Sequence, residues 1–322
     1  MDEVFVGTIV ASTLRVSVPL ILCALAGVLS ERSGVIDLGL EGKMLLTAFA
    51  TASVGVATGS MPLALAAALA VGLALSLLHG YACVTHRGDQ VVLGMAITMT
   101  AAGLSVVLGI AWFAQGGQTP PVPEPVRLAD WFSGAGAAVA QVPVLGKALS
   151  LALFGHNLMV YASLALVAAV WWLLFRTRFG LRLRAAGENP TMVDAAGVSV
   201  QALRYQALAL NGVLSALAGA YLVMAQNPSF IPNMTAGRGY MALAAMIFGK
   251  WHPVGALWAC LLFGFLDAVS IRMQGAALPL IGAVPVQAIQ ALPYILTVVL
   301  LAGFIGNAIA PKALGRPYVK ER

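Results

Sequence analysis

The sequence predicts an all-α integral membrane protein, a single polytopic domain (residues 1–322) with about nine transmembrane helices, between eight and ten. Of the 322 residues, 60% are hydrophobic and 9% are charged, and the mean hydropathy is +0.91. Soluble domains carry roughly 25% charged residues, so this chain cannot cover a globule with polar side chains. The apolar residues also come in repeated long runs, which in lipid favour helices over an open sheet.

Eight of the predicted helices are apolar runs near the length that crosses a bilayer, about 20 residues. They are expected at Val4–Leu29, Leu38–Val56, Met61–Val84, Val91–Phe113, His156–Phe175, Arg204–Ala225, Val254–Ile271 and Pro285–Ile305. The remaining one, Gly239–Gly249, has about 11 residues where about 20 are needed. It is therefore expected either to begin deeper in the preceding loop or to be a half-helix buried by its neighbours.

Positive charge predicts the orientation of these helices. Cytoplasmic loops carry an excess of Lys and Arg, and the densest basic loop is Arg176–Arg204. With that loop inside and the helices alternating, thirteen Lys and Arg residues fall in inside segments and four in outside segments. The N-terminus is therefore expected outside and the C-terminus inside. The same bias explains the net charge of +6 without invoking nucleic acid.

The loop at 176–204 contains a short helix whose two ends are marked by capping residues. Asn189 is a good N-cap, because its side-chain oxygen can accept from a free backbone N–H of the first turn. Pro190 suits the first helical position, Gly197 can end the helix in a left-handed conformation, and Ser199 can cap the next helix. A helix over Pro190–Ala196 is too short to be stable alone. It is either a connector packed on its own domain or a surface element presented to a partner protein.

Polar side chains within the spans predict where a solute passes, since such groups are costly in lipid unless they face protein or a cavity. Tyrosine rings there could stack on a flat solute. Gly34, Gly39 and Gly42 either allow an unwound backbone beside Asp37 and Glu41 or let helices pack closely. The predicted path residues are Asp37, Glu41, Gln90, Asn211, Tyr240, Gln290 and Tyr294. The alternative is that each of them hydrogen-bonds neighbouring helices together.

Several kinds of chemistry find no support in the sequence. No G-x-x-x-x-G-K-[ST] phosphate loop occurs, and no predicted inside loop is long enough for a nucleotide-binding domain, which starts near about 50 residues. The four histidines lie on different segments, so neither a metal site nor a catalytic cluster is predicted. Within the spans Asp267 is the main acidic residue, which disfavours an ion-coupled carrier because ion relays usually need embedded carboxylates.

Two stretches carry a resemblance to a known family. LSERSGVIDLGLEGKM (Leu29–Met44) and RAAGENPTMVDAAGVSV (Arg184–Val200) resemble permease subunits of bacterial ABC importers in the simple-sugar and nucleoside (ribose-permease-like, branched-chain transport) family. Gly237–Leu257 and Ala291–Gly303 fit the same family in the same order. The ERSG-x-I-x-LG-x-EG form is most similar to the nucleoside branch served by lipoprotein-type binding proteins, although Asp37 stands where relatives often have Asn.

The resemblance implies a non-enzymatic, multi-pass permease of the bacterial cytoplasmic (inner) membrane that moves nucleosides or a related small polar solute by alternating access. It implies three protein partners: a cytoplasmic ABC ATPase that binds the ATP, a second permease subunit and an extracytoplasmic solute-binding lipoprotein. It places coupling to the ATPase at Arg184, Gly187, Glu188, Asn189, Pro190, Asp194 and Gly197. The alternatives are the same family importing a simple sugar or a branched-chain amino acid, and an ion-coupled secondary transporter.

Overall fold

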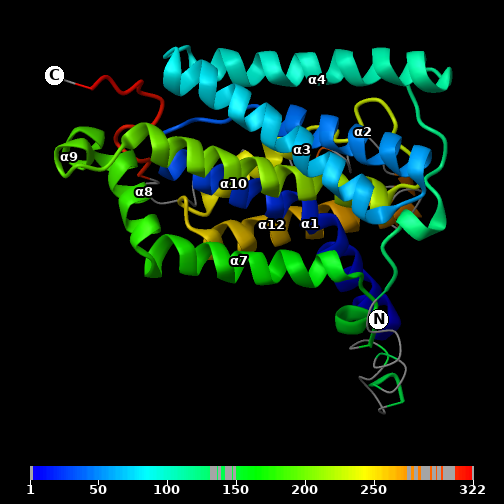
Figure 1. Cartoon of the computed structure of the whole chain (residues 1–322). Helices are drawn as coiled ribbons and strands as arrows, with labels where there is room; N and C mark the ends of the chain where they lie inside the picture. Colours follow the sequence, from blue (N-terminus) through cyan, green and yellow to red (C-terminus); the bar gives the residue numbers. More distant parts are fainter. Residues whose placement is uncertain are drawn as a thin grey trace.

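Long helices lying side by side make up most of the computed structural model (Figure 1). It describes residues 3–130, 150–273 and 309–320, together with residues 136, 139–141, 147, 277–278, 282–283, 291, 295 and 299. The long α-helices are α1 (Glu3–Arg32), α2 (Leu40–Thr58), α3 (Met61–Gly80), α4 (Gln90–Phe113), α7 (Leu158–Arg176), α10 (Val200–Tyr221) and α12 (Pro253–Met273). The shorter ones are α8 (Arg178–Glu188), α9 (Pro190–Ala195) and α11 (Arg238–Phe248).

Minor elements complete the described chain. The 3-10 helix η2 (Glu124–Val126) lies in the long connection after α4, and the π-helical turns are η1 (Tyr81–Thr85), η3 (Ser150–Phe154) and η4 (Leu222–Gln226). The two strands of the described part, β1 (Ala277–Leu278) and β2 (Gly282–Ala283), pair antiparallel over two residues each. The structure is thus nearly all-helical, as the composition predicts.

Six helical segments of the described chain are long and apolar enough to cross a membrane. They are Gly7–Arg32, Met61–Thr85, Gln90–Phe113, Leu158–Arg176, Val200–Gln226 and Pro253–Arg272. The helix α2 has 19 residues but falls outside this set and carries Glu41 and Lys43 in its first two turns. The predicted span Pro285–Ile305 lies outside the described residues. The six segments indicate a multi-pass membrane protein.

Of the six spans, α1 and α10 are the most deeply buried in the bundle. The apolar stretch of α10 is 78% buried and that of α1 is 61% buried, against 22–33% for the other four spans. The helix α1 packs against α12, α10, α11 and α7, while α10 packs against α3, α1 and α2. The less buried helices, such as α3 and α4, expose apolar side chains, as expected of surfaces that face lipid.

The short segment at 239–249 is a half-helix buried by its neighbours, and it does not begin deeper in the preceding loop. This is one of the two alternatives that the sequence left open. The helix α11 has 11 residues and begins after Gly237, whose φ of 81° is in the left-handed region. It lies against α1, α12 and α2, and its buried residues are Gly239, Ala242, Leu243, Ala245 and Met246. Neighbouring helices therefore shield a helix that is too short to span on its own.

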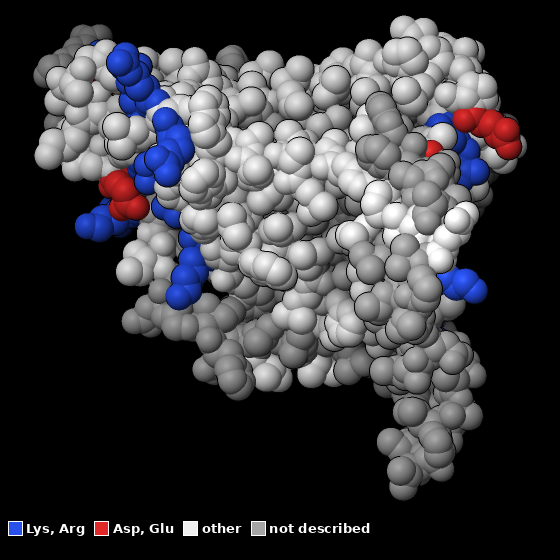
Figure 2. Space-filling model, turned by 90° about the horizontal axis from the view of Figure 1, so that it is seen from below, with Lys and Arg blue, Asp and Glu red and all other residues white. Residues whose placement is uncertain are grey.

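Charged residues are confined to two ends of the molecule on the face seen in Figure 2. A broad belt between these ends carries no Lys, Arg, Asp or Glu among the described residues on that face. Such a belt is typical of a protein whose middle lies in hydrocarbon, because exposed charge is costly there. The helices α8 and α9 and the C-terminal tail lie together at one end of the bundle (Figure 1).

Candidate functional site

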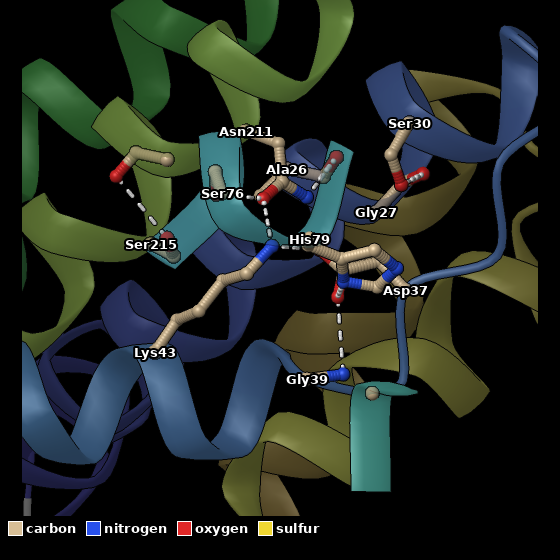
Figure 3. A network of polar contacts seen from close by, with 12 residues as sticks. Ala26, Gly27, Ser30, Asp37, Gly39, Lys43, Ser76, His79, Asn211 and Ser215 are labelled. Atoms are coloured by element: carbon tan, nitrogen blue, oxygen red, sulfur yellow. Dashed lines mark hydrogen bonds and ion pairs between the residues drawn. The ribbon is translucent and has the colours of Figure 1, made fainter. Parts of the chain in front are cut away.

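A cluster of buried polar side chains lies where four helices meet (Figure 3). Asp37 belongs to the turn between α1 and α2, and Lys43 to the start of α2. The Lys43 ammonium donates to Asp37 Oδ2 at 2.5 Å and to Asn211 Oδ1, on α10, at 3.0 Å. Both members of the ion pair are fully buried. The two predicted path residues Asp37 and Asn211 are therefore held by the same lysine.

Four further groups complete the cluster. His79, on α3, brings its Nδ1 within 3.2 Å of the other Asp37 oxygen, which also accepts from the Gly39 N–H at 3.0 Å. The Ser76 hydroxyl donates to Asn211 Oδ1, and the Asn211 amide donates to the Ala26 carbonyl of α1. Burial alone would raise the pKa of the Asp37 carboxyl, but the lysine and the histidine hold that pKa well below its usual range. The carboxylate is thus charged and satisfied, as a buried ion pair requires.

Glu41 holds the start of the half-helix α11. Its carboxylate accepts from the backbone N–H groups of Gly237 at 2.8 Å and Gly239 at 2.5 Å, and the side chain is almost fully buried. The first N–H groups of a helix have no partner within the helix, and the N-terminus carries a partial positive charge. A carboxylate from α2 satisfies both needs, so α11 is fixed to α2 at this point.

The remaining predicted path residues divide into buried, exposed and undescribed ones. Gln90 is buried at the start of α4, and its Oε1 accepts from the Ile36 N–H at 2.7 Å. Tyr240 is 38% exposed, with its hydroxyl 3.8 Å from the Met95 sulfur. Gln290 and Tyr294 lie outside the described residues. Tyr240 is therefore the predicted path residue that the described chain leaves open to its surroundings.

The glycines beside Asp37 serve both of the roles that the sequence left open. Gly34 has a φ of 92°, a conformation that residues with a side chain rarely adopt, so it forms the turn after α1. Gly42 is instead a packing residue, because a Cβ there would lie 2.5 Å from the Thr98 Cα of α4. Backbone freedom and close helix packing thus occur at separate glycines.

The helix α9 has the ends that its sequence predicts. The Asn189 side chain accepts from the Met192 N–H at 3.2 Å, and Pro190 occupies the first turn. Gly197 has a φ of 78°, and Ser199 caps α10 by accepting from the Ala202 N–H at 3.3 Å. The helix ends one residue earlier than expected, at Ala195. Local capping chemistry was sufficient to locate it.

The loop between 176 and 204 also contains a second short helix, α8, which the sequence analysis did not predict. Thr177 caps it by accepting from the Gly180 N–H at 3.1 Å, and Gly180, Leu183, Ala186 and Gly187 are buried. Arg184 does not extend into solvent: its guanidinium lies over the Phe175 ring, 4.6 Å from the centroid. The apolar spacing at 180, 183, 186 and 187 is the signal that could have found this helix.

Two exposed apolar side chains that the sequence did not single out flank a groove between α8 and α9. Leu181 is 62% exposed and Met192 is 69% exposed. The groove encloses about 540 Å³ and is lined by Leu181, Arg182, Ala185, Glu188, Asn189, Met192, Val193, Ala196 and Val198. Of the predicted coupling residues, Glu188 and Asn189 line it, whereas Gly187 is buried and Asp194 faces the other side of α9.

A cavity of about 720 Å³ lies at the opposite end of the bundle. It is lined by Ser12, Arg15, Val16, Arg127, Leu128, Ala129, Asp130, Asn157, Tyr221, Ala225, Gln226, Ala268, Ile271 and Arg272. Arg15 donates to the Gly155 carbonyl, and its own carbonyl accepts from the Tyr221 hydroxyl and the Gln226 amide. Arg15 is thus anchored to the protein at the rim of the cavity.

These features define a multi-pass helical membrane protein with paired charges in its interior and two short helices at one end, the first of which is rich in arginine. The chain belongs to the family described as the branched-chain amino acid transport system / permease component, whose model matches residues 9–305. By this description, members of the family are permease components of transport systems.

Similar proteins span the whole chain. The guanosine ABC transporter permease protein NupQ of Bacillus subtilis is 40% identical over 100% of both chains. The nucleoside ABC transporter permease protein NupC of Lactococcus lactis is 38% identical, over 98% of this chain and 97% of that protein. TsgC13 of Haloferax volcanii, described as a glucose ABC transporter permease, is 33% identical over 86% of this chain and 80% of its own length.

The fold has a counterpart among solved structures. A structure described as an inward-facing conformation of a metal-chelate type ABC transporter matches with a TM-score of 0.51. The match covers 92% of this chain and 85% of the other at 16% identity. This likeness concerns the fold alone.

Proposed function

We propose that this chain is the membrane permease of an ABC importer for nucleosides in the bacterial cytoplasmic membrane. It forms the translocation path together with a second permease subunit and works by alternating access. A separate ATPase binds the ATP, and an extracytoplasmic lipoprotein delivers the solute. The observation that carries this proposal is the full-length similarity, at 38–40% identity, to permeases described as nucleoside and guanosine transporters.

The pairing of the buried charged side chains supports an uncharged solute. The Asp37 carboxylate is paired with Lys43, and the Glu41 carboxylate is bonded to the start of α11. Neither carboxylate is therefore available to a cation, and Lys43 is not available to an anion. Among the path residues that the structure describes, Tyr240 is the exposed aromatic one, and an aromatic ring can stack on a flat base.

The end that carries α8 and α9 is the proposed contact with the ATPase. The groove between these helices offers exposed Leu181 and Met192 beside Glu188. An apolar groove with a polar rim is the usual anatomy of a protein interface. In the proposed orientation this end faces the cytoplasm, where the ATPase is found.

Transport by the assembled complex tests the proposal. The chain is co-expressed with the ATPase, second permease and binding protein of the proposed importer, and the complex is reconstituted in vesicles. ATP-dependent uptake of labelled guanosine is expected, and excess unlabelled glucose should not compete. Preferential glucose uptake would instead favour the sugar alternative, to which the similarity with TsgC13 points. Uptake by the chain alone, driven by a proton or sodium gradient, would refute an ATPase-driven importer.

The docking assignment has its own test. Leu181→Glu and Met192→Glu place a carboxylate on the exposed apolar positions and should reduce co-purification of the ATPase. Gln201→Glu is the matched control, because Gln201 is exposed at the start of α10 and lies outside the groove. Undiminished ATPase binding by both groove variants would remove this assignment.

A further inference from the structure

The C-terminal tail segment (residues 309–320) lies against the end of the bundle that carries α8 and α9 (Figure 1). It has no helix or strand, and its chain turns at residues 312–315. Pro311 and Ala313 are nevertheless buried, and Tyr318 packs against the main hydrophobic core. The tail segment is therefore packed into the fold rather than extended into solvent.

The tail segment is attached to both α8 and α9, the two helices that form the proposed docking unit for the ATPase. The Ala313 N–H donates to the Gly187 carbonyl, near the end of α8, at 2.9 Å. The Lys320 ammonium lies 3.7 Å from the Asp194 carboxylate of α9. Lys320 is 74% exposed, so this ion pair adds little stability. The backbone bond at Gly187 is the stronger attachment.

The tail segment is also attached to the turn between α1 and α2. The Gly315 N–H donates to the Gly34 carbonyl at 3.1 Å. Arg204, at the start of α10, joins the same two segments: its Nε donates to the Ser33 carbonyl at 3.2 Å and its Nη1 to the Arg316 carbonyl at 3.3 Å. The planar guanidinium suits such a two-sided contact, which an ammonium could not reproduce.

The burial of Arg204 indicates that its position is costly. The side chain is 1% exposed, and no carboxylate pairs with it in the described part of the chain. Its Nη2 is buried without a hydrogen-bond partner among the described residues. A buried donor without a partner has lost its hydrogen bonds to water and gained none in exchange, so its burial requires an explanation beyond stability.

From the α1–α2 turn, contacts continue into the membrane helices. The Ile36 N–H donates to Gln90 at the start of α4, and Asp37 enters the cluster with Lys43 and His79. A connected series of contacts thus runs from α8 and α9, through the tail segment and Arg204, to the polar cluster between α1, α2, α3 and α10.

We propose that the tail segment and Arg204 form a strap that transmits movement of α8 and α9 to the α1–α2 turn. Arg204 is a positioning residue, since it acts through the two carbonyls that it holds. This inference rests on the proposed function, because it presumes that an ATPase moves α8 and α9.

The physical reason is the small size of the docking unit. The helix α9 has 6 residues and α8 has 11, and helices this short are marginal by themselves. A push on them would be absorbed by local rearrangement unless other contacts fix them to the bundle. The strap supplies contacts that are far from α8 and α9 in sequence, and it connects them to the turn that holds the polar cluster.

The test uses the complete importer, with ATP hydrolysed per solute transported as the readout. One variant lacks residues 311–322, and another carries Arg204→Ala. Arg316→Ala is the matched control: it removes an exposed arginine of the tail segment but keeps the carbonyl that Arg204 binds. We expect both strap variants to retain the ATPase and to consume about fivefold more ATP per solute, a magnitude typical of coupling between sites.

A merely structural strap would lower the unfolding temperature of the permease and leave the ATP consumed per solute unchanged, which would overturn the proposal. Loss of the ATPase from the truncated complex would also overturn it, because the tail segment would then belong to the docking surface. If Arg204→Ala does not accumulate in the membrane, the ATP consumed per solute by the truncated variant alone decides between the two roles of the strap. Absence of an ATPase from the wild-type complex would contradict the proposed function instead.

Discussion

Replacing Lys43 with methionine is expected to destabilise the protein strongly. The lysine donates to Asp37 at 2.5 Å and to Asn211 at 3.0 Å, and both members of the ion pair are fully buried. Methionine keeps a stem of similar length, so the loss of packing is small. What remains is a buried carboxylate without its cation, and breaking a buried pair in this way costs about 3–5 kcal/mol.

The magnitude can be measured as a shift in unfolding temperature. A loss of 1 kcal/mol lowers the midpoint by roughly 2–4 °C in chains of about 150–250 residues, so Lys43→Met should lower it by roughly 10 °C. The purified protein is heated in detergent, and the fraction that remains monodisperse is followed. The control is Lys320→Met, because that lysine is 74% exposed and exposed pairs contribute about 0–1 kcal/mol.

A double variant distinguishes the ion pair from simple loss of a side chain. Asp37→Asn combined with Lys43→Met removes both charges, and replacing a buried pair by neutral groups is often close to neutral. The double variant should therefore be more stable than Lys43→Met alone. The reasoning is refuted if Lys43→Met unfolds at the wild-type temperature, or if removal of the Asp37 charge brings no recovery.

Three further predictions concern single contacts. Glu41→Ala removes the acceptor at the start of α11 and should cost about 1–3 kcal/mol in thermal unfolding, because a buried N–H and a partly buried N–H lose their partner; an unchanged midpoint would contradict this. Gly42→Ala should cost about 1–3 kcal/mol by overpacking against α4, whereas Gly103→Ala, where a Cβ meets nothing within 4 Å, should not destabilise. Asn189→Ala removes the N-cap of α9, worth about 0.5–2 kcal/mol; hydrogen exchange at residues 190–195 should accelerate, while unchanged protection there would disprove the capping role.

Features set by neighbouring residues could be predicted from the sequence. The class of protein followed from the apolar runs, and the ends of α9 followed from Asn189, Pro190 and Gly197 because capping involves residues three or four apart. The half-helix α11 was one of the two alternatives that the length of its apolar run left open. The family resemblance followed from stretches that are continuous in the chain, such as Leu29–Met44.

Features that depend on contacts across the fold could not be predicted in this way. His79 meets Asp37 and Glu41 meets Gly239 only because particular helices pack side by side, and sequence spacing gives no register between helices. Arg204 was placed where the basic loop meets the next span, and nothing in the local sequence indicated that it is buried. The helix α8 was overlooked because its arginines lie between the residues of its apolar face, so the segment looks polar in sequence. That face is buried only when α8 packs against the bundle.

The capping of α11 by Glu41 has an electrostatic consequence for any solute that approaches it. Half-helices in transporters commonly direct their N-terminus toward an anionic group of the cargo. Here the partial positive charge of that terminus is already neutralised by a carboxylate of the chain itself. The first N–H groups of α11 are therefore already bonded within the chain and are not free to bind an anion, unlike those of the half-helices just described.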